Sequence, residues 1–219
     1  MKAIEIPEAP LGDDPTVALT TGYAQSKYII ERVTQAAAEQ LAIPIHLLRV
    51  GQLCGSTTSG LWNTSEMWPI MFSTSVSLKA LPNLPSKSVD WIPVDTAASV
   101  ISDIICNSGS STYSVHNIVN PCPISWETLV EILKEILGLE VVGIKEWVER
   151  LQDVDEKREI VGMKLLDMFE GMVGDEEASK IFQTDKTKEI SQALRDCPAV
   201  GEAWMRNYAE QWKKGGFMA

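Results

Sequence analysis

The apolar residues of this chain fall into segments with helical spacing and segments with strand spacing. Between residues 22 and 41, apolar side chains recur about every 3.6 positions among good helix formers, and Thr20 or Thr21 can cap the start. Pro44 bars continuation of this helix. The run at residues 45–50 that follows is apolar and ends at Gly51, which predicts a buried strand of parallel type.

The rest of the chain is predicted to be mostly helical. The pattern predicts helices over residues 61–77, 96–106, 126–137, 146–151, 157–171, 175–181, 187–194 and 202–214, with Ser125 as a cap. Extended segments are expected at residues 89–95, 113–119 and 140–143. The pattern therefore indicates an α/β protein that is mostly helical, with a few short strands.

Composition and charge narrow the possible functions. The chain has 219 residues, 45% of them hydrophobic, and 19 Lys and Arg against 30 Asp and Glu give a formal charge of −11. An acidic protein is not expected to bind nucleic acid or anionic membranes through bulk charge. The N-terminus has no apolar signal core, and no stretch approaches the roughly 20 apolar residues of a membrane span, so a soluble, cytoplasmic protein is expected.

The cysteines and histidines do not predict a metal site. Four cysteines are scattered along the chain without a C-x-x-C pair, and no histidine cluster has the spacing of zinc ligands.

Tyr23 and Lys27 are the first candidates for chemistry. They lie four residues apart at the start of the first predicted helix, so their side chains share one face about one turn apart. An ammonium beside a phenol stabilises the phenolate, which suits the phenol for passing a proton to a carbonyl oxygen. The same spacing also arises by chance in many helices.

Several motifs occur in the order found in one known family. They are Thr21-Gly22-Tyr23-Ala24-Gln25-Ser26-Lys27-Tyr28, then Arg49-Val50-Gly51-Gln52, then Trp91-Ile92-Pro93-Val94-Asp95. In these the chain resembles the extended short-chain dehydrogenase/reductase family. Within it, the likeness is closest to the terminal thioester reductase domains of fungal non-ribosomal peptide and polyketide synthetases and of carboxylate reductases. The stretches Gly60-Leu61-Trp62-Asn63 and Glu66-Met67-Trp68-Pro69 are similar to those domains too.

The resemblance implies a role for each matching residue. Tyr23 would be the proton donor to the substrate carbonyl, and Lys27 would assist it while binding the nicotinamide ribose. Gly51 and Gln52 would border the nicotinamide if a nucleotide-binding half is supplied. The segment from Trp62 to Phe72 would wall the acyl or phosphopantetheine channel, with these residues as its lining: Trp62, Asn63, Met67, Trp68 and Met71. Plain core packing is the competing interpretation of these aromatic side chains, and a helix cap explains Asp95.

The chain also departs from the family pattern. No G-x-G-x-x-G or G-x-x-G-x-x-G motif is present, although such a turn binds the pyrophosphate of NADPH in the full-length family. The upstream Ser or Thr of the usual triad is also absent. We therefore expect the C-terminal half of a reductase, with a truncated Rossmann-type fold and no cofactor bound by this chain alone.

This expectation divides the chain into two parts. Residues 1–60 would be the remnant of the Rossmann-like domain. Residues 61–219 would be a helical substrate-binding subdomain that returns one strand, at about 113–119, to the sheet. Without neighbouring strands, a helix face and a strand edge stay uncovered, which predicts a homodimer or larger assembly.

Three functions follow as hypotheses. The first is the substrate-binding and catalytic half of a thioester or carboxylate reductase that acts on a polyketide or peptidyl thioester, with a carrier protein or a separate N-terminal half as partner. The second is a cofactor-independent cyclase, hydrolase or dehydratase, in which Cys54 or His46 adds a nucleophile or base. The third is a non-catalytic module that docks a synthetase.

Overall fold

The computed structural model describes residues 4–18, 21–85, 87–107, 109, 112–155, 159–174 and 180–218. More of these residues belong to helices than to strands, as the sequence pattern predicts. The α-helices are α1 (Gly22–Leu41), α2 (Met67–Leu78), α3 (Val94–Asn107), α4 (Trp126–Leu137), α5 (Ile144–Gln152), α6 (Leu166–Glu170), α7 (Asp185–Ile190), α8 (Gln192–Arg195) and α9 (Glu202–Lys214). Two short 3₁₀ helices span Pro15–Ala18 and Val161–Leu165.

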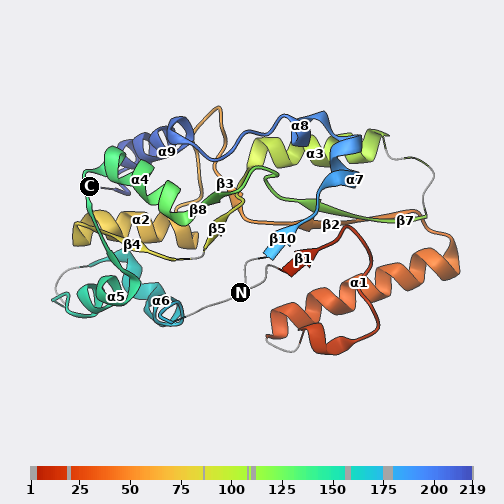
Figure 1. The fold of residues 1–219 in the computed structure, drawn as a ribbon, viewed down its shortest axis with the longest axis horizontal. Coiled ribbons are helices and arrows are strands. Elements are labelled where there is room, and N and C mark those ends of the chain that lie inside the picture. The colour runs from red at the N-terminus through yellow and green to blue at the C-terminus, as the bar shows by residue number, and fades with distance from the viewer. Residues whose placement is uncertain are drawn as a thin grey trace.

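The strands are short and lie in pairs. They are β1 (Ile4–Ile6), β2 (Ile45–Val50), β3 (Leu53–Cys54), β4 (Ala80–Asn83), β5 (Ser88–Val89), β6 (Ile92–Pro93), β7 (Tyr113–Ile118), β8 (Ile124–Ser125), β9 (Glu140–Gly143) and β10 (Lys180–Phe182). The pairs β1–β10, β2–β7, β3–β6 and β4–β9 are parallel, and β5–β8 is antiparallel. Figure 1 shows the long β2–β7 pair between α1 on one side and α3, α7 and α8 on the other.

Helix α1 has the bounds that its periodicity and its breaker residue predict. Thr21 is the N-cap, because its hydroxyl oxygen accepts a hydrogen bond from the backbone N–H of Ala24 at 3.1 Å. The predicted apolar face is only partly covered, since Ile29 and Val33 are 59% and 61% exposed. Strand β2 is likewise half-buried where a buried strand was expected. Both differences have one cause: among the described residues, β7 is the one strand that pairs with β2.

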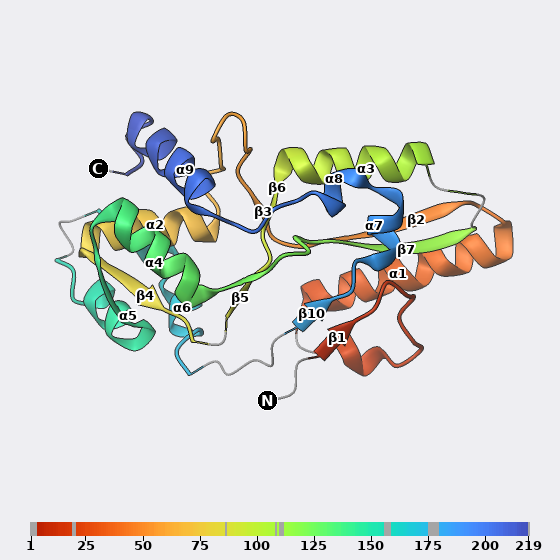
Figure 2. The same cartoon turned by 45° about the horizontal axis from the view of Figure 1, so that its top comes forward.

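The larger core lies at the other end of the molecule, where Figure 2 shows α2, α4, α5 and α9 around the short strand β4. Its centre is aromatic. The ring of Trp68 lies 5.0 Å from that of Trp91 and 5.1 Å from that of Trp126, measured between centroids. Aromatic pairs at such spacing add stability beyond the area they bury.

Some predicted elements begin or end elsewhere. The helix expected over 61–77 starts at Met67, because the preceding residues form turns, with the Asn63 side chain accepting from the backbone N–H of Ser65. The extended segment 89–95 is broken into β5 and β6, and α3 already begins at Val94. Of the helix expected over 175–181, residues 175–179 lie outside the described residues and the last two belong to β10. The domain boundary near residue 60 stays a prediction.

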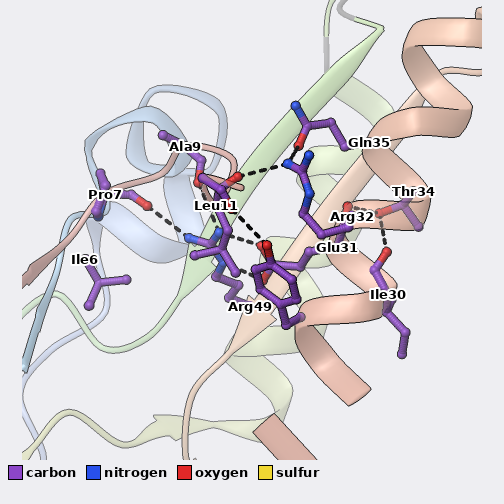
Figure 3. A network of polar contacts seen from close by, with 12 residues as sticks. Ile6, Pro7, Ala9, Leu11, Ile30, Glu31, Arg32, Thr34, Gln35 and Arg49 are labelled. Carbon is purple, nitrogen blue, oxygen red and sulfur yellow. Dashed lines mark hydrogen bonds and ion pairs between the residues drawn. The ribbon is translucent and has the colours of Figure 1, made fainter. Parts of the chain in front are cut away.

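One arginine fastens the first part of the chain together. Arg49, near the end of β2, donates from Nε and Nη2 to the two carboxylate oxygens of Glu31 on α1, at 2.8 and 2.7 Å. It also donates to the carbonyl oxygens of Pro7 and Ala9, at 3.1 and 3.0 Å. We call residues 4–16 the N-terminal strap. Figure 3 shows this strap held against α1, where Arg32 binds the carbonyl oxygen of Leu11.

We predict that Arg49→Ala lowers the free energy of unfolding by about 3 kcal/mol. The side chains of Arg49 and Glu31 are only 15% and 12% exposed, and removing one partner of a buried pair leaves the other charge uncompensated. Urea unfolding measures the change. In Arg206→Ala, an exposed helix pair with Glu202 is lost and little change is expected. Equal shifts in the two variants contradict the assigned role of Arg49.

Candidate active site

Tyr23 and Lys27 lie side by side at the exposed start of α1. The ammonium nitrogen of Lys27 is 5.2 Å from the centroid of the Tyr23 ring, within the range of a cation–π contact. The Tyr23 side chain is 73% exposed. The structure therefore brings this pair together as the four-residue spacing predicts, and it leaves the phenol open to a reactant from solvent. Their catalytic role stays a prediction.

Gly51 and Gln52, which follow β2, lie toward the same end of the α1 and β2 elements as Tyr23 and Lys27. Helix α1 and strand β2 run in opposite directions, and the Glu31–Arg49 contact fixes their register. From Glu31, Lys27 and Tyr23 lie about 6 and 12 Å along the helix at 1.5 Å per residue. From Arg49, Gly51 lies about 7 Å along the chain in the same direction. The register thus points the predicted nicotinamide residues toward the predicted proton donor.

Gly51 has a packing reason of its own. A Cβ at this position would lie 2.6 Å from a methyl group of Val119, so a side chain can be added only if the Val119 side chain moves. The backbone N–H of Gly51 continues the β2–β7 pairing by donating to the carbonyl oxygen of Ile118 at 3.0 Å. The close approach of Val119 therefore accounts for a glycine here whether or not a cofactor contacts it.

Glu66 connects the two halves of the predicted site, and sequence reasoning assigned it no role. Its carboxylate accepts from the indole nitrogen of Trp62 at 3.0 Å and from the amide nitrogen of Gln52 at 3.4 Å. It is the N-cap residue of α2 but makes no side-chain capping bond. One carboxylate therefore joins a predicted cofactor residue to a predicted substrate residue. The Trp62 to Glu66 spacing of four residues is the signal that could have suggested it.

The predicted channel residues divide into two groups. Trp62, Trp68 and Met71 are buried, with exposed fractions of 6%, 3% and 0%. Asn63 is exposed and Met67 is half-buried. In this structure these three side chains are packed in the core, as the competing interpretation has it. A role for all five in substrate binding stays a prediction.

Asp95 holds a loop, which corrects the expectation of a helix cap. Helix α3 begins one residue earlier, and the Asp95 carboxylate accepts from the backbone N–H and hydroxyl of Thr57 at 2.9 and 2.8 Å and from the Ser56 hydroxyl at 3.1 Å. Burial alone would raise the pKa of Asp95, but these hydrogen bonds favour the carboxylate and keep the pKa below its usual value. Asp95 thereby fastens the loop that follows β3.

The structure separates the two residues offered for cofactor-independent catalysis. The Cys54 thiol is 3.6 Å from the Tyr208 hydroxyl in the core, and burial raises the pKa of this thiol to about 12. His46 instead contacts the Ser114 hydroxyl at 2.6 Å. Cys54 is thus neither paired with His46 nor ionised near neutral pH, so the expected nucleophile is not supported.

Further properties of the described residues bear on ligands. A shallow cavity of about 300 Å³ opens between β5, β8 and the start of α4, and its lining includes Lys87 and Glu127 but none of the predicted site residues. No group of three or more potential metal ligands occurs in the described part of the chain. None of the helices described there is both long and apolar enough to cross a bilayer.

Comparisons with known proteins agree on one group of relatives. Residues 8–101 match the family model described as "Male sterility protein". An adenylate-forming reductase from Heterobasidion annosum is 31% identical over 238 residues, which cover 99% of this chain and 21% of that protein. The chain thus spans about a fifth of the length of this curated relative.

Solved reductase domains share the fold. The terminal R domain from the myxalamid biosynthetic pathway superimposes with a TM-score of 0.81 at 22% identity, covering all of this chain and 56% of that one. A thiolation-reductase di-domain from an archaeal non-ribosomal peptide synthetase superimposes with a TM-score of 0.71 at 20% identity, covering 99% and 44%. At these identities the likeness establishes the fold.

We predict that the four free cysteines react with a thiol reagent in two classes. Cys106 and Cys122 are exposed, whereas Cys54 and Cys197 are buried, and burial raises the pKa of Cys197 to about 11. At about pH 8, near the ordinary pKa of a thiol, Cys106 and Cys122 should be modified in the folded protein and the other two only after unfolding. Timed labelling followed by peptide mass spectrometry identifies each site. Rapid labelling of Cys54 in the folded chain would show that the thiol is accessible after all.

Proposed function

The chain belongs to the family of terminal reductase domains found in synthetases and carboxylate reductases, within the extended short-chain dehydrogenases/reductases, and on this premise we propose that it contributes the substrate-binding and catalytic half of a thioester reductase. Both the family and the Rossmann-type α/β fold were predicted from the motifs. The observation that carries the proposal is the contact between Lys27 and Tyr23 at the exposed start of α1. The substrate class proposed is a polyketide or peptidyl thioester.

Tyr23 and Lys27 have complementary tasks in this proposal. The Tyr23 hydroxyl hydrogen-bonds the carbonyl oxygen of the thioester and gives it a proton as negative charge develops there. The Lys27 ammonium stabilises the phenolate that Tyr23 leaves behind. The exposed position of the phenol supports this assignment, because the carbonyl group must approach it from outside the helix.

The family implies a nicotinamide cofactor, and the described residues fit one end of it. Lys27 lies in the second turn of α1, and Gly51 and Gln52 directly follow β2, a position that suits the nicotinamide and its ribose. When bound, NADPH supplies the hydride. The chain has no glycine-rich turn for the pyrophosphate, so we propose that it does not hold the cofactor tightly alone and is not competent for reduction by itself.

Substrate binding is assigned to the segment between Gln52 and α2. In the predicted set, Asn63 is exposed and Met67 is half-buried, so these two side chains can contact a ligand. The Glu66 carboxylate orients the buried Trp62 by accepting from its indole nitrogen. A phosphopantetheine arm offers amides for hydrogen bonding and an apolar acyl chain, which matches a surface of mixed character. A carrier domain would deliver this arm, and one structural neighbour is a thiolation-reductase di-domain.

We predict that the purified chain binds an acyl-pantetheine thioester but does not bind NADPH at micromolar concentration. Isothermal titration measures the first and nicotinamide fluorescence the second. Tyr23→Phe should weaken thioester binding by about 2- to 10-fold, the effect of losing one neutral hydrogen bond. Tyr28→Phe, about 1.4 turns further along the same helix, is the control, because its hydroxyl donates to the carbonyl oxygen of Gly12 and not to the substrate; it should bind as the unaltered chain does.

The outcomes separate the parts of the proposal. Absence of thioester binding overturns the substrate assignment. Micromolar NADPH binding by the chain alone overturns the proposal that it does not hold the cofactor tightly by itself. It leaves the proposed roles of Tyr23 and Lys27 untouched. Equal loss in the Tyr23 and Tyr28 variants shows that the hydroxyl of Tyr23 has no special contact with the substrate.

We propose further that the uncovered face of α1 associates with a second copy of the chain. Ile29, Ile30 and Val33 are exposed on this helix, which gives it an apolar patch facing solvent. Two-fold association through one helix face is a common way to cover such a patch.

We predict a dimer of twice the 24.2 kDa chain mass in light scattering. Ile29→Glu should shift the protein to monomer, because a charge is costly to bury in an apolar contact. The matched control is Ile105→Glu, at an exposed position on α3. A monomer without any substitution would refute the association.

A further inference from the structure

Lys87 and Glu127 carry opposite charges beside one shallow cavity. This cavity measures about 300 Å³, and its other lining residues are Ser88, Pro123, Ile124 and Ser125. Both Lys87 and Glu127 are exposed. Neither side chain forms an ion pair or a hydrogen bond with any residue that the structure describes. An unpaired ammonium and an unpaired carboxylate therefore border the same space.

The backbone around the cavity is fixed by hydrogen bonds. Strand β5 pairs with β8 on one side of it. The backbone N–H of Trp126, the first residue of α4, donates to the carbonyl oxygen of Lys87 at 2.9 Å. Trp126 is fully buried, and its indole nitrogen donates to the carbonyl oxygen of Pro82 at 2.9 Å. Because Glu127 directly follows Trp126, Lys87 and Glu127 are held close together on a rigid frame.

An amide group matches this pair of charges better than other ligand groups do. An amide has one N–H donor and one carbonyl acceptor, which point in opposite directions across a trans peptide bond. Its carbonyl oxygen can accept from the Lys87 ammonium while its N–H donates to the Glu127 carboxylate. A plain aliphatic chain would cover both charges without offering either one a partner, which is costly. An anion would be attracted by the ammonium but repelled by the carboxylate.

The cavity lies within reach of the predicted reaction site. The backbone N–H of Ile92 in β6 donates to the carbonyl oxygen of Gln52 at 3.0 Å. Ser88, which lines the cavity, comes four positions before Ile92, and a fully extended chain spans at most about 14 Å over that length. A peptidyl group of about four residues has a similar reach. A thioester carbonyl beside Gln52 can therefore belong to a group whose far end lies in the cavity.

We propose that this cavity is a subsite for the amide groups of a peptidyl thioester, which Lys87 and Glu127 hold from opposite sides. The subsite rests on the proposed thioester reductase function, and it narrows the substrate class from polyketide or peptidyl groups to peptidyl groups. A peptide joined to its carrier as a thioester has no free terminal carboxylate, so its amides are the groups that satisfy the two charges. Pro123 and Ile124 pack against the methylene groups between these amides.

Isothermal titration of the intact chain with two matched probes tests the subsite. N-acetyl-triglycyl-pantetheine and undecanoyl-pantetheine have acyl chains with the same number of atoms, but only the first has amides in its acyl group. Lys87→Met and Glu127→Gln should each weaken binding of the first probe by about 3- to 10-fold, the effect of losing one hydrogen bond. Binding of the undecanoyl probe should not weaken in either variant, because its acyl chain makes no such bond.

An exposed ion pair elsewhere supplies the matched controls. Lys145 Nζ and Glu149 Oε1 lie 3.8 Å apart on α5, and neither residue lines the cavity. Lys145→Met and Glu149→Gln change the charge of the chain as the two test variants do, so they should bind both probes as the unaltered chain does. Equal losses in the test and control variants overturn the subsite, because the net charge alone would then explain them.

Amide NMR signals locate the bound probe. The signals of Ser88 and Ile124 should shift when N-acetyl-triglycyl-pantetheine is added, and the signal of Lys145 should not. Shifts that leave Ser88 and Ile124 unchanged overturn the subsite.

A third probe separates the subsite from the reductase function. N-acetyl-triglycine amide carries the same amides without a thioester, and the same NMR signals report its binding. If only this probe binds and Lys87→Met weakens it, the proposed reductase function fails and the subsite stands. If both thioesters bind equally well to the unaltered chain and to the Lys87 and Glu127 variants, the subsite fails and the thioester binding expected of a reductase stands. Absence of binding by all three probes overturns both.

Discussion

A single guanidinium group sets the geometry on which the proposed chemistry depends. Arg49 reaches from β2 to α1 and to the strap, and its planar fork matches the two oxygens of Glu31 while its remaining donors bind backbone carbonyls. The two charges are largely shielded from water, so their attraction is little screened. If the helix slid by one turn relative to the strand, Tyr23 would move by about 5.4 Å and lose its place beside the end of β2.

The second part of the molecule is organised by indole rings rather than by ion pairs. The Trp147 nitrogen donates to the carbonyl oxygen of Ala80 at 3.0 Å, and the Trp126 nitrogen donates to that of Pro82 at 2.9 Å. Both carbonyls belong to β4, so two tryptophans from α4 and α5 hold one short strand at their common centre. Each indole buries a large apolar surface and still satisfies its one donor. This explains how a chain whose described strands are short and pair only two by two builds a dense core.

Local patterns were predictable from the sequence and distant contacts were not. The bounds of α1 and β2 follow from periodicity, a threonine cap and Pro44, all of which act within a few residues. The pairing of β4 with β9 was missed at β4, because a four-residue strand that contains Pro82 has no pattern to detect. The burial of Glu8 depends on partners 178 and 179 positions away. A place for Glu31 on the same helix face as Tyr23 and Lys27 was predictable, since Glu31 continues their four-residue spacing.

The parallel pairing of β1 with β10 has a consequence for the order of assembly during synthesis. Ile4 is opposite Lys180, so β1 is synthesised long before the strand that pairs with its backbone groups. Contacts this far apart along the chain close slowly, because the entropy of a long loop is lost before any pairing is gained. Trp68, Trp91 and Trp126 precede β10 in the chain and can pack together before that closure, whereas Trp212 of the same core follows β10. In the nascent chain, the backbone groups of β1 therefore stay without their β10 partners while much of the remaining structure is already synthesised.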